Sequence, residues 1–225
     1  MNSAGRLPAH LAGLRIAVTR ATERGGPLAE ALRRLGATVH EVPLTRIETL
    51  DLAPLHAAMG RLAQYDWILL TSVNAVEHLA RVVHERQAQA AMATRRLAVV
   101  GDATARAADD QGWRTPTVQP ERSQAEGVLD ALAERTDIEG SRVLYPCAAG
   151  ARDVLPDGLR ALGAEVDVIP VYRSASDPEG QARLAALVRE QALDLVTVAA
   201  PSAVDALLDA LAPEQAGRLP LACIG

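Results

Sequence analysis

The chain has 225 residues, of which 49% are hydrophobic and 23% charged, and its formal net charge is −5. This is the composition of an ordinary globular protein that is long enough for one large domain or two small ones. It offers no basic field for a nucleic acid or an anionic membrane, no apolar run of the roughly 18 residues that a membrane span needs, and no signal-peptide pattern. Two cysteines are too few for a disulfide framework or a zinc site, so we predict Cys147 and Cys223 to be small core residues of a cytoplasmic protein.

Short apolar runs alternate with helical patterns along the chain. We expect strands at 15–19, 67–71, 97–100 and 115–118, and helices near 28–35, 51–64, 74–86 and 103–111. The segment 38–44 alternates and contains Pro43, which is typical of an edge strand. Asn74 with Glu77, and Ser123 with Glu126, match the capping box that opens a helix. Strands that are apolar on both faces and alternate with helices predict an α/β protein with parallel sheets covered by helices.

The sequence also contains an internal duplication. Residues 15–46 align without a gap with residues 142–173, residues 66–80 resemble 194–208, and "LAVVG" at 97–101 resembles "LACIG" at 221–225. The three matches keep their order and nearly the same offset, which is far longer than a solenoid repeat. We therefore infer two copies of a domain-sized unit.

The second copy begins near Ser141 and stops at Gly225. It contains no counterpart of the helix, strand and capped helix that follow residue 101 in the first copy. We expect a truncated second unit, with an apolar patch exposed around Leu221 and Ile224.

Several signatures of catalysis and cofactor binding are absent from the sequence. There is no G-x-G-x-x-G after a strand, no P-loop, no G-x-S-x-G elbow and no H-E-x-x-H. Most histidines fall on expected helices, and we interpret all five as solvated residues: His10, His40, His56, His78 and His84.

Small polar residues gather instead where the expected strands meet helices. These residues are Thr19, Arg20, Thr71, Ser72, Asn74, Gly101, Thr104, Ser123 and Ser202. In open parallel sheets such junctions lie at the carboxyl edge, where free N–H groups of helix N-termini suit carboxylates or phosphates. One cap alone is typical of a structural role, but equivalent junctions in both copies predict a two-sided cleft for an anionic ligand.

Seven segments, in their order, resemble the uroporphyrinogen-III synthase family from Leu14 to Gly225. They are "VTR" (18–20), "YDWILLTSVNAVEHL" (65–79), "VVGDATARAADDQG" (99–112), "AEGVLDAL" (125–132), "VLYPCAAGARDVLPDGLRALGAEVDVIPVYR" (143–173), "APSAVDALL" (200–208) and "IG" (224–225). The resemblance implies two similar flavodoxin-like domains, each an open parallel sheet, joined by a two-stranded linker with the active cleft between them. It implies that residues 1–38 and 174–225 form a discontinuous first domain, that 49–164 form the second, and that 39–48 and 165–173 connect them.

The family's enzymes cyclise hydroxymethylbilane, a linear tetrapyrrole with eight carboxylates, invert its last pyrrole ring and release water. By this resemblance we expect no metal and no organic cofactor, and a monomer that binds its substrate through the junction residues above. Tyr172 matches a tyrosine near the cleft that helps the hydroxyl leave, and the alternative is a packing role on a linker strand. Where the family often has a hydroxyl residue, this chain has Ala200.

An alternative of a different class is a non-catalytic, two-lobed protein that binds an anionic small molecule. An oxidoreductase is disfavoured because the dinucleotide fingerprint is absent.

Overall fold

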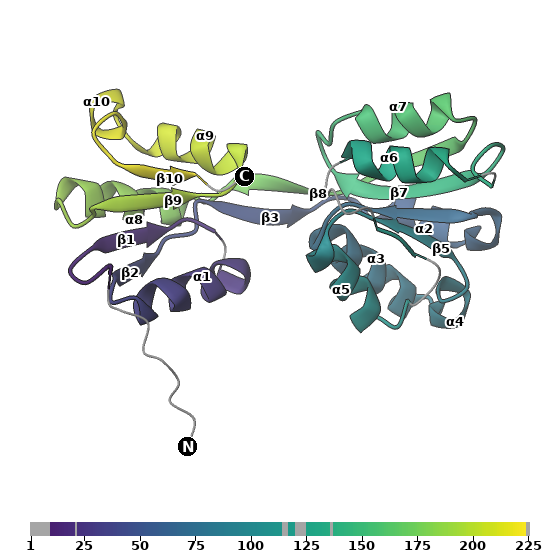
Figure 1. The fold of residues 1–225 in the computed structure, drawn as a ribbon, viewed down its shortest axis with the longest axis horizontal. Helices are drawn as coiled ribbons and strands as arrows, with labels where there is room; N and C mark the ends of the chain where they lie inside the picture. Colours follow the sequence, from purple (N-terminus) through teal and green to yellow (C-terminus); the bar gives the residue numbers. More distant parts are fainter. Residues whose placement is uncertain (1–9, 21, 114–116, 120–124, 136, 224–225) are drawn as a thin grey trace, which may run out of the picture. The chain divides into compact units, whose positions relative to one another are not determined.

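The computed structural model describes residues 10–223 except 21, 114–116, 120–124 and 136. Helices and strands alternate along the chain, as expected of an α/β protein (Figure 1). The elements in chain order are β1 (Arg15–Val18), α1 (Thr22–Arg34), β2 (Thr38–Glu41), β3 (Thr45–Thr49), α2 (Ala53–Met59), the 3-10 turn η1 (Leu62–Gln64), β4 (Trp67–Leu70), α3 (Val73–Glu85), α4 (Gln89–Met92), β5 (Arg96–Val99), α5 (Asp102–Asp110), β6 (Thr117–Val118), α6 (Ala125–Ala133), β7 (Arg142–Ala148), α7 (Val154–Ala161), β8 (Glu165–Ser176), α8 (Pro178–Arg189), β9 (Leu195–Val198), α9 (Pro201–Ala210), α10 (Pro213–Ala216) and β10 (Leu221–Cys223). The helix predicted over 51–64 is shorter than expected, because α2 ends before Gly60 and only a 3-10 turn follows.

The chain divides into two compact units. The first comprises Met1–Ile47 with Ser174–Gly225, and the second comprises Glu48–Arg173. One sheet has the strand order β10-β9-β1-β2 and the other has the order β3-β8-β7-β4-β5-β6. Neighbouring strands from β10 to β2 and from β8 to β6 run parallel.

Most of each segment that we expected to connect the domains lies inside a sheet. β2 pairs with β1, and β8 pairs with β7 from Glu165 to Tyr172. β2 lies at one end of the strand order, so the prediction of an edge strand in this region is confirmed. The boundaries between the two units fall within β3 and within β8.

The two sheets pair equivalent residues of the two copies in the same register. Ile16 lies opposite Leu195 where β1 pairs with β9, and the equivalent residues Val143 and Trp67 lie opposite each other where β7 pairs with β4. The pairs β9–β10 and β4–β5 also share one register. These registers agree with the predicted duplication, but each sheet combines strands from both copies.

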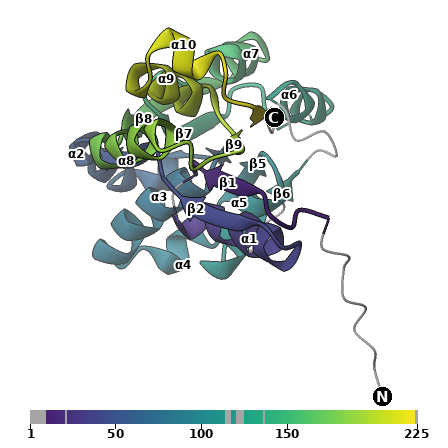
Figure 2. The same ribbon diagram turned by 90° about the vertical axis from the view of Figure 1, so that its left-hand side faces the viewer.

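Helices cover both faces of each sheet because the chain leaves the centre of the sheet in two directions. From β4 it passes through α3 to β5, and from β7 it passes through α7 to β8 on the other side. Since such crossovers are right-handed, α3 and α7 pack on opposite faces. One core includes residues of α2, α3 and α5, and a second core includes residues of α6 and α7. In the first unit α1 lies on one side of the sheet, and α9 and α10 lie on the other (Figure 2).

A carboxylate holds the start of a central strand in each unit. The backbone N–H of Arg15 donates to Asp194 at 2.8 Å, and the N–H of Arg142 donates to Asp66 at 2.9 Å. The guanidinium of Arg15 also donates to Asp194, with 2.8 Å between Nη2 and Oδ1. Hydrogen bonds from the side chain and then the backbone of Arg15 lower the pKa of Asp194 from 3.8 to about 2. In both units this contact joins a residue of one copy to a residue of the other.

The two cysteines differ in their surroundings. Cys147 is buried, as predicted, and burial raises its pKa to about 11. Cys223 is exposed, so the prediction of a core position is wrong for this residue, because β10 is the outermost described strand of its sheet.

Apolar surface is exposed beside α9 and α10. Leu208 and Leu221 are exposed and line an apolar hollow there, whereas Ile224 lies outside the described residues. None of the helices within the described ranges is long and apolar enough to cross a membrane.

Candidate functional site

The strand order points to one place in each unit where a ligand is expected. Open α/β sheets bind ligands beyond the carboxyl ends of neighbouring strands whose helices lie on opposite faces. In the second unit these strands are β4 and β7, and in the first unit they are β1 and β9. The sequence-predicted residues Thr71 and Ser72 follow β4, and Thr19 and Arg20 follow β1.

Tyr172 reaches the junction after β4. Its hydroxyl oxygen lies 2.9 Å from Oγ of Ser72, and either oxygen can be the donor. The residue is 8% exposed, so most of the ring is buried.

A β-bulge in β8 explains the direction of this side chain. The pairing with β7 shifts by one residue just before Tyr172. Val171 and Tyr172 consequently share one core, whereas successive residues of a regular strand point to opposite faces. The bulge therefore turns Tyr172 toward α3.

Ser72 is the N-cap of α3. Its backbone is extended, with φ −158° and ψ 152°, and its Oγ accepts a hydrogen bond from the N–H of Ala75 at 3.1 Å. The prediction that Asn74 with Glu77 caps this helix is wrong, because Asn74 is already inside the first turn and is buried. The hydroxyl of Ser72 thus lies between the N-terminus of α3 and the hydroxyl of Tyr172.

His78 packs against Tyr172 from the second turn of α3. The two rings are stacked, with 5.6 Å between centroids and 22° between planes. Nδ1 lies 2.7 Å from the carbonyl oxygen of Asn74, and Nε2 lies 3.0 Å from Oγ1 of Thr49. His78 is partly exposed on α3, so its interpretation as a solvated helix residue holds only in part, because Thr49 of β3 and Tyr172 of β8 contact its ring.

Tyr145 is a second phenol at these strand ends, and the sequence analysis missed it. Its hydroxyl lies 3.5 Å from Oγ1 of Thr71, and burial raises its pKa. The available signal was a tyrosine inside an apolar strand, since a buried phenol usually needs a hydrogen-bond partner.

The junction between β5 and α5 offers backbone groups and no side-chain cap. Gly101 adopts φ 82°, a conformation that favours glycine, and no side chain caps the helix. Thr104, in the first turn of α5, is buried, and Asp102 accepts a hydrogen bond from Gln119 at 2.6 Å. Ser123, also predicted for the site, lies outside the described residues.

In the first unit the predicted residues are placed differently. Thr19 is fully buried and its hydroxyl donates to the carbonyl oxygen of Thr197 at 2.6 Å, so this side chain is committed to the sheet. Arg20 is exposed. Ser202 is partly exposed in the first turn of α9 and accepts a long hydrogen bond, 3.4 Å, from Ser174.

The starts of α3 and α9 differ in their caps. Ala200 occupies in α9 the position that Ser72 occupies in α3, and it provides no side-chain cap. The first unit consequently has no hydroxyl at this N-cap position.

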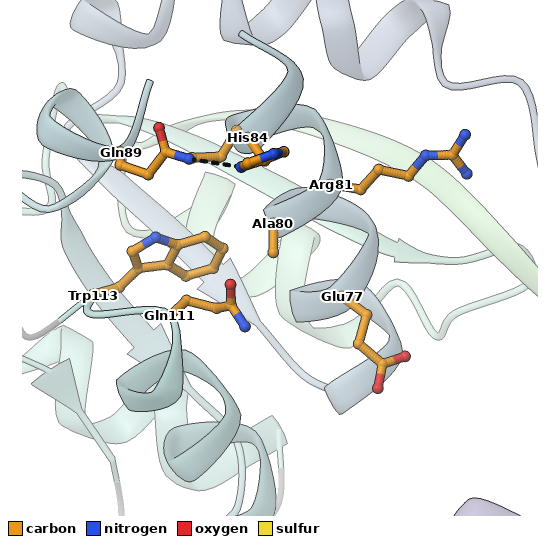
Figure 3. Close-up of a pocket in the computed structure, with 8 residues that line it drawn as sticks. Glu77, Ala80, Arg81, His84, Gln89, Gln111 and Trp113 are labelled. Carbon is orange, nitrogen blue, oxygen red and sulfur yellow. Dashed lines mark hydrogen bonds between the residues drawn. The ribbon is translucent and has the colours of Figure 1, made fainter. Parts of the chain in front are cut away.

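A hollow of about 410 Å³ lies along α3, α4 and the end of α5 (Figure 3). Residues such as Arg81, His84 and Trp113 line it, and none of the sequence-predicted site residues does. Within the described ranges, no group of three or more His, Cys, Asp or Glu residues could hold a metal ion.

Comparison with known families identifies the family of the chain. The model of the family described as uroporphyrinogen-III synthase HemD matches residues 26–225. The chain belongs to the uroporphyrinogen-III synthase family. The resemblance seen in the sequence is therefore confirmed.

Several relatives in the family align with most of the chain. The putative uroporphyrinogen-III synthase of Methanothermobacter thermautotrophicus is 34% identical, over 85% of this chain and 76% of the relative. The uroporphyrinogen-III synthase of Synechococcus elongatus is 32% identical, over 73% of this chain and 62% of the relative. The porphyrin biosynthesis protein HemD of Ruminiclostridium josui is 29% identical over 96% of this chain, but the alignment spans only 43% of that relative.

Solved structures of the family share the fold. A mutant uroporphyrinogen III synthase of Thermus thermophilus superposes with a TM-score of 0.66 at 19% identity, covering 94% of this chain and 84% of that one. The uroporphyrinogen-III synthetase of Helicobacter pylori gives a TM-score of 0.55 at 16% identity, covering 93% of this chain and 82% of that one. The predicted fold class, two α/β units with parallel sheets, is confirmed.

Proposed function

We propose that this protein is a uroporphyrinogen-III synthase, which cyclises hydroxymethylbilane, inverts the last pyrrole ring and releases water. The observation that carries the proposal is the family match over residues 26–225. The hydroxyl pair of Ser72 and Tyr172 at the carboxyl end of β4 supplies a group that suits the first step.

The reaction begins with the loss of a hydroxyl from the first ring, which leaves a resonance-stabilised azafulvenium ion. A proton on Oη of Tyr172 is available to the departing oxygen, so the C–O bond breaks and water leaves. The hydroxyl of Ser72 can donate to the tyrosine oxygen at that moment, since its own oxygen accepts from the N–H of Ala75.

The substituted carbon of the last ring then attacks the azafulvenium ion and forms a spiro intermediate. This intermediate fragments and recloses with the ring turned over, and the final loss of a ring proton restores the proton spent at the start. Uncatalysed closure gives the unturned isomer, so the main task of the protein is to hold the chain of pyrroles in one conformation.

We also propose that the substrate carboxylates bind at helix starts in both units. The groups concerned are Thr71, Ser72, Gly101 and Thr104 in the second unit, and Arg20 and Ser202 in the first. Their positions after parallel strands support this assignment, because backbone N–H groups at such sites bind anions. The sequence-based expectations of a monomer and of a cytoplasmic location remain predictions, which light scattering and cell fractionation would test.

The first prediction concerns turnover and Tyr172. Hydroxymethylbilane incubated with the protein should give the III isomer, measured by chromatography of the oxidised porphyrins. Tyr172→Phe should lower kcat by about tenfold or more, which is the range of help from a general acid. Tyr65→Phe is the matched control, because its hydroxyl bonds Asp167 and Arg61 at the amino end of β4 and β8.

Two outcomes would contradict this prediction. Formation of the I isomer at the uncatalysed rate would favour a binding protein. An unchanged kcat in a folded Tyr172→Phe variant would leave Tyr172 with a packing role only.

A further inference from the structure

The imidazole of His78 is held from three directions. Its Nδ1 faces the carbonyl oxygen of Asn74, its Nε2 faces the hydroxyl of Thr49, and its ring face stacks on Tyr172. A carbonyl oxygen can only accept, so Nδ1 must carry a hydrogen. The neutral ring is therefore fixed as the Nδ1–H tautomer, with Nε2 accepting from Thr49.

Tyr172 gains its second restraint from this ring. Ser72 holds the hydroxyl at one end, and His78 covers one face of the ring. Rotation of the tyrosine ring about its own axis, or a change of its χ1 angle, would break the stacked contact.

The elements that support His78 are also joined to each other. Glu48 and Arg173 form an ion pair with 2.7 Å between Oε2 and Nη2. These residues directly neighbour Thr49 in β3 and Tyr172 in β8, respectively. The backbone N–H of Leu50 also donates to the carbonyl oxygen of Val171 at 3.0 Å. The two partners of His78 that lie outside α3 are thus kept at a fixed spacing.

We propose that His78 is a positioning residue that fixes the ring, and so the hydroxyl, of Tyr172. A group that gives a proton in a transition state depends on its placement, and a misplacement of about 1 Å can cost on the order of 100-fold in rate. The functional part of this inference rests on the role proposed above for Tyr172, whereas the fixing of the ring does not.

The ring itself is tested by fluorine NMR. The chain has only three tyrosines, so protein labelled with 3-fluorotyrosine should give three groups of signals, and Tyr172→Phe assigns one of them. His78→Ala should shift or broaden the Tyr172 signal and leave the other two in place. His84→Ala is the matched control in the same helix, because its ring contacts Gln89 and should leave all three signals unchanged.

The functional part is tested by kinetics of III-isomer formation. His78→Ala should lower kcat about tenfold with KM changed by less than about twofold, since binding groups are untouched. His78→Phe keeps a ring to stack on Tyr172 and should restore kcat to within about threefold of the wild type. His84→Ala should retain the wild-type kcat.

The outcomes separate the two proposals. If the Tyr172 signal is unchanged in His78→Ala, the positioning role is overturned whatever the turnover. If the Ala variant fails to fold, His78→Phe is compared with His78→Leu, which has no aromatic ring. The same Tyr172 signal in those two variants then overturns the positioning role. A shifted signal with an unchanged kcat overturns it for catalysis. Absence of III-isomer formation by the wild type contradicts the proposed function instead, and the fluorine signal alone then decides whether His78 fixes the ring.

Discussion

At the scale of single residues, the candidate site is assembled by contacts between distant parts of the chain. The hydroxyls of Ser72 and Tyr172 meet although 100 residues separate them, and His78 reaches Thr49 across 29 residues. Sequence patterns predicted Ser72 and Tyr172 as site residues because each belongs to a recognisable segment. They could not identify His78, since a histidine on an amphipathic helix looks the same whether another strand covers it or water does.

The ion pair of Arg15 and Asp194 predicts a specific dependence of stability on pH. The folded pKa of Asp194, about 2, is below its ordinary value of 3.8, so the folded state binds this proton less readily than the unfolded state. The pair therefore stabilises the fold fully above about pH 4, and this contribution is lost as the pH falls toward about 2. Asp194→Asn should flatten the decrease in the free energy of unfolding across this window, measured by urea titration at several pH values.

A double-mutant cycle provides the control for this pair. Arg15→Gln should flatten the same window only in part, because the backbone N–H of residue 15 still donates to Asp194. The double variant should show the same acid dependence as Asp194→Asn, because the carboxylate that titrates is already absent. If the free energy of unfolding decreased equally with falling pH in wild type and in Asp194→Asn, the ion pair would stabilise the fold no more than hydration of the two side chains does.

At the scale of elements, much of the alternation of strands and helices was predictable, because strands such as β1, β4 and β5 are short apolar runs and helices such as α3 have one apolar face. The starts of the helices were less predictable. Ser72 and Asn74 are both good N-caps, and the capping-box pattern favoured Asn74. Ser72 caps the helix because β4 ends at Leu70 and the chain enters α3 within two residues.

Helix α8 begins in direct contact with the loop after β2. Asp177 caps the helix and its own N–H donates to the carbonyl oxygen of Leu44 at 2.8 Å. Gly180, in the first turn, lies so close to the loop that a Cβ atom would overlap the carbonyl oxygen of Pro43. No other residue fits there without moving backbone.

Gly180→Ala should therefore destabilise the protein by about 1–3 kcal/mol, the usual range for overpacking. Gly26→Ala, in α1, is the matched control because a Cβ atom there meets nothing within 4 Å. The control should gain about 0.5–1 kcal/mol from the lower flexibility of alanine in the unfolded chain. Urea denaturation of both variants measures the difference, and equal effects would show that the loop yields without cost.

At the scale of the whole molecule, the duplication was visible in the sequence, but the pairing of its strands was not. β1 could pair with β4 of its own copy as well as with the equivalent β9, because the two strands present the same kind of apolar residues. The structure pairs β1 with β9 and β4 with β7, so each sheet contains strands of both copies. Only the resemblance to a known family favoured this arrangement, since local patterns satisfy both.

The exchange of strands predicts which part of the chain folds alone. Residues 48–173 form one continuous unit. It contains both β4 and β7, which pair with each other, and two hydrophobic cores. Residues 1–140, the whole first copy, contain β1 and β4 but lack β9 and β7, the strands that complete the centre of each sheet. An isolated fragment 48–173 should unfold in one sigmoidal urea transition and show dispersed amide signals, because its cores are intact. Fragment 1–140 is a little longer but should show neither property, because the apolar faces of its strands have no partners to cover them. If fragment 1–140 unfolded cooperatively and fragment 48–173 did not, each copy would be a folding unit and the strands would pair within copies.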